Sequence, residues 1–232
     1  MTKVAGDTAP TNDEGPSQSS RYELSTDLVT LMDHRPEEAE AIRTIRTHII
    51  ARHLKDGRRG LAVCAVSRGT GCSFTAANLA VSLAQAGVAT LLIDADLRQP
   101  GLESLVRPQS PTDGLRQCLE SYDGDASSLL HAEVIPNLSL LFSGGVAPNA
   151  QEILAGNPFR KLIERSLRDF EITIVDTPPS SLCADARRIS SVVGYSLVVA
   201  RTNVSRVGDL GVLASQLQED GARVVGTVLN EV

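Results

Sequence analysis

Short apolar runs alternate along the chain with longer segments in which apolar residues recur at helical spacing. The apolar runs are typical of buried strands and cover residues 61–66, 89–93, 138–142, 172–175, 196–200 and 224–229. The segments with helical spacing cover residues 36–54, 75–86, 114–120, 150–167, 184–192 and 207–219. Alternation of this kind indicates right-handed βαβ crossovers. It predicts an α/β fold in which helices cover both faces of a parallel sheet, an arrangement of three layers.

The composition divides the chain into an arm and one domain. Residues 1–25 are rich in Thr, Asp, Pro, Gly and Ser, and we expect them to be disordered. Residues 26–232 are expected to form a single domain. With 42% hydrophobic and 22% charged residues, the chain has the composition of an ordinary domain with a well-buried core.

A loop with two glycines joins the first predicted strand to the helix that follows it. Residues 67–74 read Ser-Arg-Gly-Thr-Gly-Cys-Ser-Phe. In this context the backbone N–H groups near Gly69 and Gly71 can approach phosphate oxygens, and the hydroxyl of Ser73 can bind magnesium. The alternative is an ordinary turn between strand and helix, because glycine turns are common. The sequence therefore predicts either a phosphate-binding loop or a structural turn.

Carboxylates follow two further predicted strands. Residues 89–100 contain Asp94 and Asp96 after an apolar run, and residues 171–179 place Asp176 at the tip of another strand. Open α/β sheets bind ligands at the carboxyl ends of their strands. Together with Ser73, these carboxylates supply the oxygen ligands and the base that magnesium-dependent phosphoryl transfer requires. Each aspartate could instead cap a helix or stabilise a turn, which is the commoner role after a strand.

These three motifs resemble the Walker A, Walker A′ and Walker B motifs of the bacterial tyrosine kinases. Those proteins are cytoplasmic autokinases of capsule and exopolysaccharide synthesis, and they are related to the septum-site and plasmid-partition ATPases. The resemblance extends from about residue 28 to the end of the chain, and it implies the P-loop NTPase fold. It also includes Glu40, Arg43 and Arg46, which match an oligomerisation signature of the family, Glu-x-x-Arg-x-x-Arg. The alternative for these three is a set of surface pairs within one helix.

The sequence departs from the family pattern at the residue that usually grips ATP. Cys72 stands where the family carries the Walker A lysine, and Ser67 stands where the partition ATPases carry a second lysine. A thiol cannot follow the charge of a phosphate, so we expect ATP binding to be weak or lost. Arg68 could supply the missing cation. Cys72 could alternatively be a reactive thiolate, because it lies near a helix N-terminus.

The resemblance implies roles for the residues of the site. ATP or ADP with Mg²⁺ is the expected cofactor, held by Arg68, Gly69, Thr70, Gly71, Cys72, Ser73 and Phe74. The metal is expected at Ser73, Asp94 and Asp176, and the catalytic base is either Asp94 or Asp96. The family's kinases also end in a tyrosine-rich tail, whereas this sequence ends at Val232 and has tyrosines at positions 22, 122 and 195.

Charge and hydropathy restrict the partners. The formal net charge of −6 argues against a nucleic-acid surface, which needs a basic footprint. The four cysteines lack the spacing of a zinc site. No run of 18 apolar residues is present, and the first 20 residues do not read as a signal peptide, so we expect a cytoplasmic protein. By resemblance we expect a homo-oligomer that is recruited to the inner face of the membrane by the cytoplasmic tails of a polysaccharide copolymerase. An active tyrosine kinase and a partition-type positioning ATPase are the alternatives.

Overall fold

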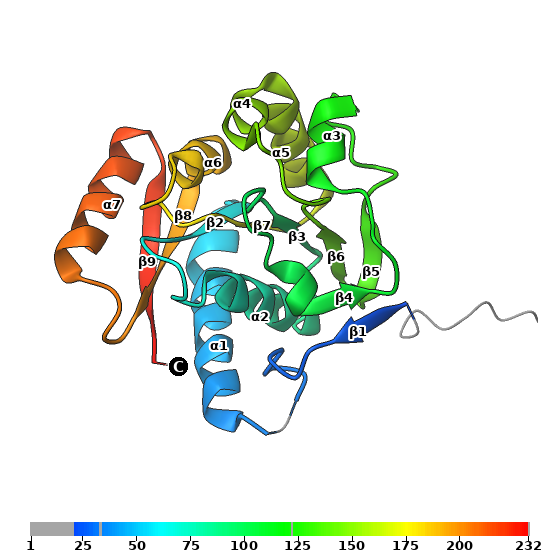
Figure 1. Cartoon of the computed structure of the whole chain (residues 1–232). Helices are drawn as coiled ribbons and strands as arrows, with labels where there is room; N and C mark the ends of the chain where they lie inside the picture. The colour runs from blue at the N-terminus through cyan, green and yellow to red at the C-terminus, as the bar shows by residue number, and fades with distance from the viewer. Residues whose placement is uncertain (1–20, 33, 122, 232) are drawn as a thin grey trace, which may run out of the picture.

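The computed structural model describes residues 21–32, 34–121 and 123–231, and its elements follow the predicted alternation (Figure 1). The arm expected at residues 1–25 lies mostly outside the described residues. Within its last residues, Tyr22–Leu24 form strand β1 rather than disordered chain. β1 pairs with β4 (Val106–Pro108) in a small antiparallel ribbon that the sequence pattern did not predict.

The main sheet has seven strands in the order β5-β6-β3-β7-β2-β8-β9. In this order, every strand after β6 pairs in parallel with the strand before it, as expected for βαβ crossovers. The strands are β2 (Gly60–Ala65), β3 (Thr90–Asp94), β5 (His131–Ile135), β6 (Leu138–Leu141), β7 (Ile172–Asp176), β8 (Tyr195–Arg201) and β9 (Arg223–Asn230).

Helices cover both faces of this sheet, so the predicted three-layer fold is confirmed (Figure 1). One face carries α1 (Pro36–Ile49), its π-helical continuation η2 (Ile50–Leu54) and α2 (Cys72–Gln85). The other face carries α3 (Leu115–Ser121), α4 (Ala150–Ala155), α5 (Asn157–Asp169), α6 (Asp185–Val193) and α7 (Val207–Glu219). A short 3₁₀ turn, η3 (Leu102–Ser104), follows β3.

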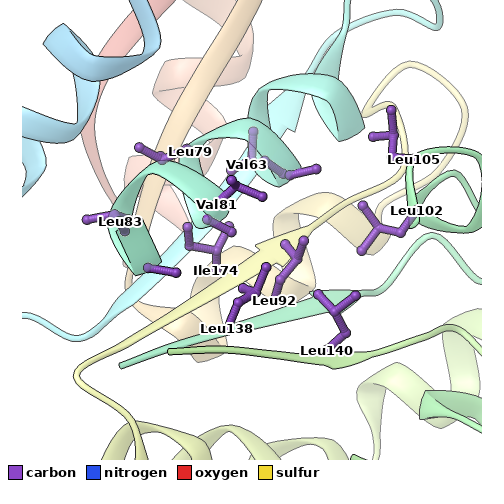
Figure 2. Packing of buried hydrophobic residues seen from close by; sticks show 14 of the residues in the cluster. Val63, Leu79, Val81, Leu83, Leu92, Leu102, Leu105, Leu138, Leu140 and Ile174 are labelled. Carbon is purple, nitrogen blue, oxygen red and sulfur yellow. The ribbon is translucent and has the colours of Figure 1, made fainter. Parts of the chain in front are cut away.

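The core divides into two layers because alternate residues of a strand point to opposite faces. Figure 2 shows the layer beneath α2, where Leu79 and Leu83 pack against Val63, Leu92 and Ile174 of the central strands. Strands β2, β3 and β7 are buried along their whole length, which explains why they read as continuous apolar runs.

Two elements differ from the prediction, each for a local reason. The edge strand β5 runs antiparallel to β6, so the sheet is not entirely parallel. Only residues 136 and 137 connect the two strands, and so short a connection permits a hairpin but no crossover. The single helix predicted at 150–167 is two helices, because Gly156 adopts extended backbone before Asn157 and Pro158 begin α5.

Candidate functional site

The glycine loop lies between the end of β2 and the start of α2. Gly69 and Gly71 have φ angles of +71° and +87°, in the left-handed region that favours glycine. A Cβ atom on Gly71 would lie 2.2 Å from Nδ2 of Asn230, so the space there is also closed to a side chain. α2 begins at Cys72, three residues before the predicted start, and its first turn therefore faces the loop.

Two residues from the far strands hold the loop in place. Nη1 of Arg201, at the end of β8, donates to the carbonyl of Gly69 at 2.6 Å. Nδ2 of Asn230, at the end of β9, donates to the carbonyl of Thr70 at 3.0 Å. Neither contact was predicted from the sequence, although a polar residue at the carboxyl end of a parallel strand indicates a position on the ligand side of the sheet.

Cys72 is turned into the protein rather than toward the loop. Its thiol donates to the carbonyl of Val63 at 3.1 Å and lies 3.8 Å from the carbonyl of Thr177. Burial, together with the negative charge of Asp176, raises the pKa of this thiol well above its usual range. A neutral thiol is neither a nucleophile nor a metal ligand, so the geometry does not support the reactive thiolate that was the alternative for Cys72.

Asp94 is completely buried at the end of β3, and both of its carboxylate oxygens accept backbone hydrogen bonds. Oδ1 accepts from the N–H of Asp96 at 3.1 Å, and Oδ2 accepts from Gly101 and Leu102 at 3.1 Å each. Burial and the neighbouring carboxylate of Asp176 raise the pKa of Asp94. Asp94 therefore caps the backbone after β3, which is the alternative role predicted for an aspartate at the end of a strand.

Asp96 holds the turn that follows and leaves one oxygen available. Its Oδ1 accepts from the N–H groups of Arg98 at 3.1 Å and Gln99 at 2.9 Å. Burial raises the pKa of Asp96, while these N–H groups and the positive charge of exposed Arg68 oppose the shift. The positive charge of Arg68 thus favours the ionised form of Asp96 across the site.

Asp176 differs from both because neither of its carboxylate oxygens forms a hydrogen bond of good geometry among the described residues. It is completely buried at the tip of β7. Burial raises its pKa, whereas the nearby Ser73 hydroxyl, Cys72 thiol and Thr177 N–H oppose the shift. The hydroxyl of Ser73 faces the chain at Gly101, where an added Cβ would lie 2.7 Å from it.

The two unpartnered oxygens of Asp176 and the hydroxyl of Ser73 fit a hard cation that also binds phosphate. Within the described chain, no group of three or more His, Cys, Asp and Glu residues is placed to hold a metal ion by itself. Magnesium usually takes only one or two protein oxygens and completes its shell with water and phosphate, so this donor set suits Mg²⁺ with a nucleotide. Asp94, by contrast, has no oxygen free of backbone donors.

Phe74 lies outside this centre, on the outer side of the loop. It lines a cavity of about 290 Å³ together with Asp27, Arg35, Gly69, Gly71, Arg201 and Asn230. The guanidinium of Arg35 lies 6.0 Å from the centre of the Phe74 ring. The cavity adjoins the glycine loop, so a molecule whose phosphates bind the loop could extend into it.

An ion pair that the sequence analysis missed lies beside the carboxylates. Nε of Arg98 donates to Oδ2 of Asp185 at 2.7 Å, and the carboxylate of Asp185 is buried. Arg98 follows the Asp96 turn, whereas Asp185 begins α6, so only the fold brings them together. The isolated position of Asp185 after a turn gave no sign of this partner.

The three residues of the predicted oligomer interface do not share one environment. Arg43 pairs with Glu40 at 3.4 Å on the exposed side of α1. Arg46 instead contacts α2, where Nη1 lies 3.4 Å from the hydroxyl and 3.5 Å from the carbonyl of Ser82. Glu40 and Arg43 therefore remain exposed to a neighbour, while Arg46 also joins two helices of the same chain.

Comparison with known proteins gives relatives of one kind. The chain is 35% identical over 173 residues to the tyrosine-protein kinase CpsD of Streptococcus agalactiae, which covers 74% of this chain and 75% of that kinase. It is 31% identical over 193 residues to the tyrosine-protein kinase wzc of Salmonella typhi, which covers 83% of this chain but only 27% of the longer kinase. No protein-family model matches the chain.

Solved structures agree with these relatives. The chimerical protein CapA2B2 superposes with a TM-score of 0.80 at 26% identity, over 90% of this chain and 92% of that one. The septum site-determining protein MinD of Pyrococcus horikoshii, in complex with Mg-ADP, superposes with a TM-score of 0.62 over 74% of this chain and 70% of that one. At 20% identity the likeness to MinD shows the fold alone.

In the described residues, no helix is long and apolar enough to cross a bilayer.

Matched substitutions should separate the two buried aspartates. Because the raised pKa of Asp176 means that stability is lost as the pH rises through it, Asp176→Asn should raise the free energy of unfolding at pH 8 by about 1 kcal/mol, and by less at pH 5. Asp94→Asn should lower it by about 1 kcal/mol at pH 5, where the raised pKa keeps the Asp94 side chain neutral, because an amide has one acceptor oxygen in place of the two that accept three backbone N–H groups. Urea unfolding at both pH values, without nucleotide or magnesium, measures both effects. Equal destabilisation by the two substitutions would contradict this difference.

Proposed function

The chain belongs to the family of bacterial tyrosine-protein kinases, and from this premise we propose that it is a kinase-like component of capsule or exopolysaccharide synthesis and export whose use of ATP is impaired. In this proposal it acts as a regulatory or scaffold partner of a membrane polysaccharide copolymerase. The cytoplasmic tails of the copolymerase recruit it to the inner face of the membrane.

The position of Cys72 carries the proposal. The family's lysine would place an ammonium against the β and γ phosphates, whereas the Cys72 thiol is neutral and donates to the carbonyl of Val63. The described lysines are Lys55, on the chain after η2, and Lys161, which pairs with Asp123. Loss of a charge-assisted phosphate contact costs about 2 to 4 kcal/mol in a transition state, which lowers a rate by about 30-fold to 1,000-fold.

The rest of the site supports residual binding of ATP or ADP with Mg²⁺. Backbone N–H groups of residues 69–73 would bind the phosphates, and Ser73 and Asp176 would hold the metal. When bound, Mg²⁺ neutralises charge that develops on the transferred phosphoryl group. Asp96 is a better candidate than Asp94 for accepting a proton from a tyrosine hydroxyl, because one oxygen of Asp96 is free of backbone donors while both oxygens of Asp94 are occupied.

Two alternatives differ from this proposal in the fate of ATP. In an active tyrosine kinase, Arg68 would replace the lysine, and its electrostatic effect on Asp96 favours this reading. A positioning ATPase of the partition type has the same fold, but Ser67 stands where that class carries its signature lysine.

Restoring the lysine should restore nucleotide affinity. We expect Cys72→Lys to lower the Kd for magnesium-ATP by about tenfold or more in isothermal titration calorimetry, because it adds charge-assisted hydrogen bonds. Cys72→Ala removes the thiol without adding a charge and is the control. Tight binding by the unsubstituted protein that Cys72→Lys does not improve and that Arg68→Ala abolishes would favour the active-kinase alternative.

The exposed pair on α1 is proposed to contribute to self-association. Replacing Glu40 and Arg43 with alanine should shift the sedimentation coefficient toward that of a monomer, whereas the pair costs little stability because an exposed i,i+3 pair contributes only about 0.5 kcal/mol or less. Arg46→Ala is measured separately, since it also breaks the contact with Ser82. If the double variant sediments like the unsubstituted protein, the pair is a surface feature only.

A scaffold should tolerate the loss of a site carboxylate better than the loss of the whole protein. In the bacterium that carries the gene, we expect Asp176→Asn to reduce polymer output much less than deletion, because docking does not need the metal site. The measurement is polymer mass per cell, with the level of the variant protein checked by immunoblot. A normally abundant variant whose output falls as far as in the deletion strain would show that nucleotide chemistry is required.

A further inference from the structure

A groove separates α1 and η2 from the edge strand β9, on the face of the sheet that also carries α2. It encloses about 430 Å³, and β9 lines it from Arg223 to Val228. Ile45 and Ile49 of α1 form one apolar wall, and Leu197 of β8 contributes to the floor. In Figure 1, β9 lies at the end of the sheet with α7 on one side and α1 on the other.

The rim of the groove is basic although the chain as a whole is acidic. Arg52, Arg58 and Arg223 line it, and among the residues that the structure describes no aspartate or glutamate does. Arg58 pairs with Asp56 at 3.0 Å and lies over the ring of Tyr195. Arg52 and Arg223 have no ion-pair partner in the part of the chain that the structure describes, and both are exposed. In a chain of net charge −6, such a site favours an anionic ligand.

The edge of β9 is open for pairing. β9 pairs with β8 along one side, and its other side is the end of the sheet. Edge strands usually carry charged residues, proline or a bulge that hinder further pairing. β9 has a register irregularity between Val224 and Gly226, but between Arg223 and Asn230 it reads Val-Val-Gly-Thr-Val-Leu, without charge or proline. Leu229 is 60% exposed. An extended peptide could therefore add a strand here while its side chains reach the apolar wall.

From the open edge, the apolar wall and the unpaired arginines, we infer that this groove binds an extended, acidic segment of a partner protein as an added strand on β9. Its apolar side chains pack against Ile45 and Ile49, and its carboxylates lie against Arg52 and Arg223. This interaction goes beyond the proposed function and does not depend on nucleotide binding.

The next part of the groove limits where the segment lies. A second cavity continues past Ile45 and Val228, and Glu37, Glu38 and Glu231 line it. These carboxylates repel an acidic peptide, so it is confined to the part of β9 from Arg223 to Val228. About six residues of extended chain span that part, at roughly 3.3 Å per residue.

A designed peptide tests the groove. The probe is a fluorescein-labelled octapeptide with serine at alternate positions and valine or glutamate at the positions between them, so that valine and glutamate lie on the one face that meets the groove. The control peptide has lysine in place of glutamate. Fluorescence anisotropy with the full chain should show binding of the acidic peptide only, weaker at high salt because the contacts are charged. The Arg52→Gln, Arg223→Gln double variant should weaken binding by about tenfold or more, whereas Arg160→Gln, on the exposed side of α5, should change it by less than about twofold.

Backbone methylation of the probe distinguishes strand addition from charge attraction alone. Two versions of the acidic peptide carry N-methyl groups on alternate residues, so only one version blocks the N–H groups that face β9. We expect one version to lose binding and the other to keep it. The inference is overturned if both bind equally, if the lysine peptide binds as well, or if the double variant binds like the unsubstituted protein. It is equally overturned if the peptide fails to bind while phosphatidylglycerol vesicles bind through Arg52 and Arg223, since the groove would then recognise a membrane surface.

Discussion

The parallel register of β3, β7 and β2 is the constraint on which the site depends. It places Asp94 directly opposite Asp176, and Asp176 opposite Val63, so that two buried carboxylates and the acceptor of the Cys72 thiol lie side by side. Two like charges at one buried sheet edge repel each other. Asp94 accepts three backbone N–H groups, whereas neither oxygen of Asp176 forms a hydrogen bond of good geometry in the described residues. Asp176 is then the natural place for a cation.

The glycine loop owes its shape to contacts that do not require a lysine at position 72. Arg201 and Asn230 bind its carbonyls from β8 and β9, and two glycines in left-handed conformations direct its N–H groups. Cys72 completes the first turn of α2 by contacting Val63. A loop of this kind can therefore keep its conformation when the residue that grips the nucleotide has been replaced, which explains how the fold and the impaired chemistry coexist in the proposed function.

Strand β9 takes part in both regions of interest. Its carboxyl end holds the glycine loop through Asn230, and its first residues line the basic groove. The register between β8 and β9 shifts between Ser196 and Leu197, at the level of that groove. Such irregularities are common at sheet edges, where they bend a strand and increase its twist. Strand β9 is thus irregular near its first residues, and its last residue holds the glycine loop.

The sequence by itself determined the elements with strong periodicity and the residues at strand ends, because burial on both faces of a parallel strand leaves a continuous apolar run and the ligand side lies where that run stops. It therefore located the glycine loop, Asp94, Asp96 and Asp176. It could not locate β5, because His-Ala-Glu-Val-Ile is a short mixture of polar and apolar residues, and the direction of β5 follows from a two-residue connection. Nor could it decide between capping and catalysis for the aspartates, or find the contacts of Arg201, Asn230 and Asp185. Those depend on which elements become neighbours and on where each side chain points, and only the tertiary structure brings together residues that are 87 to 160 positions apart.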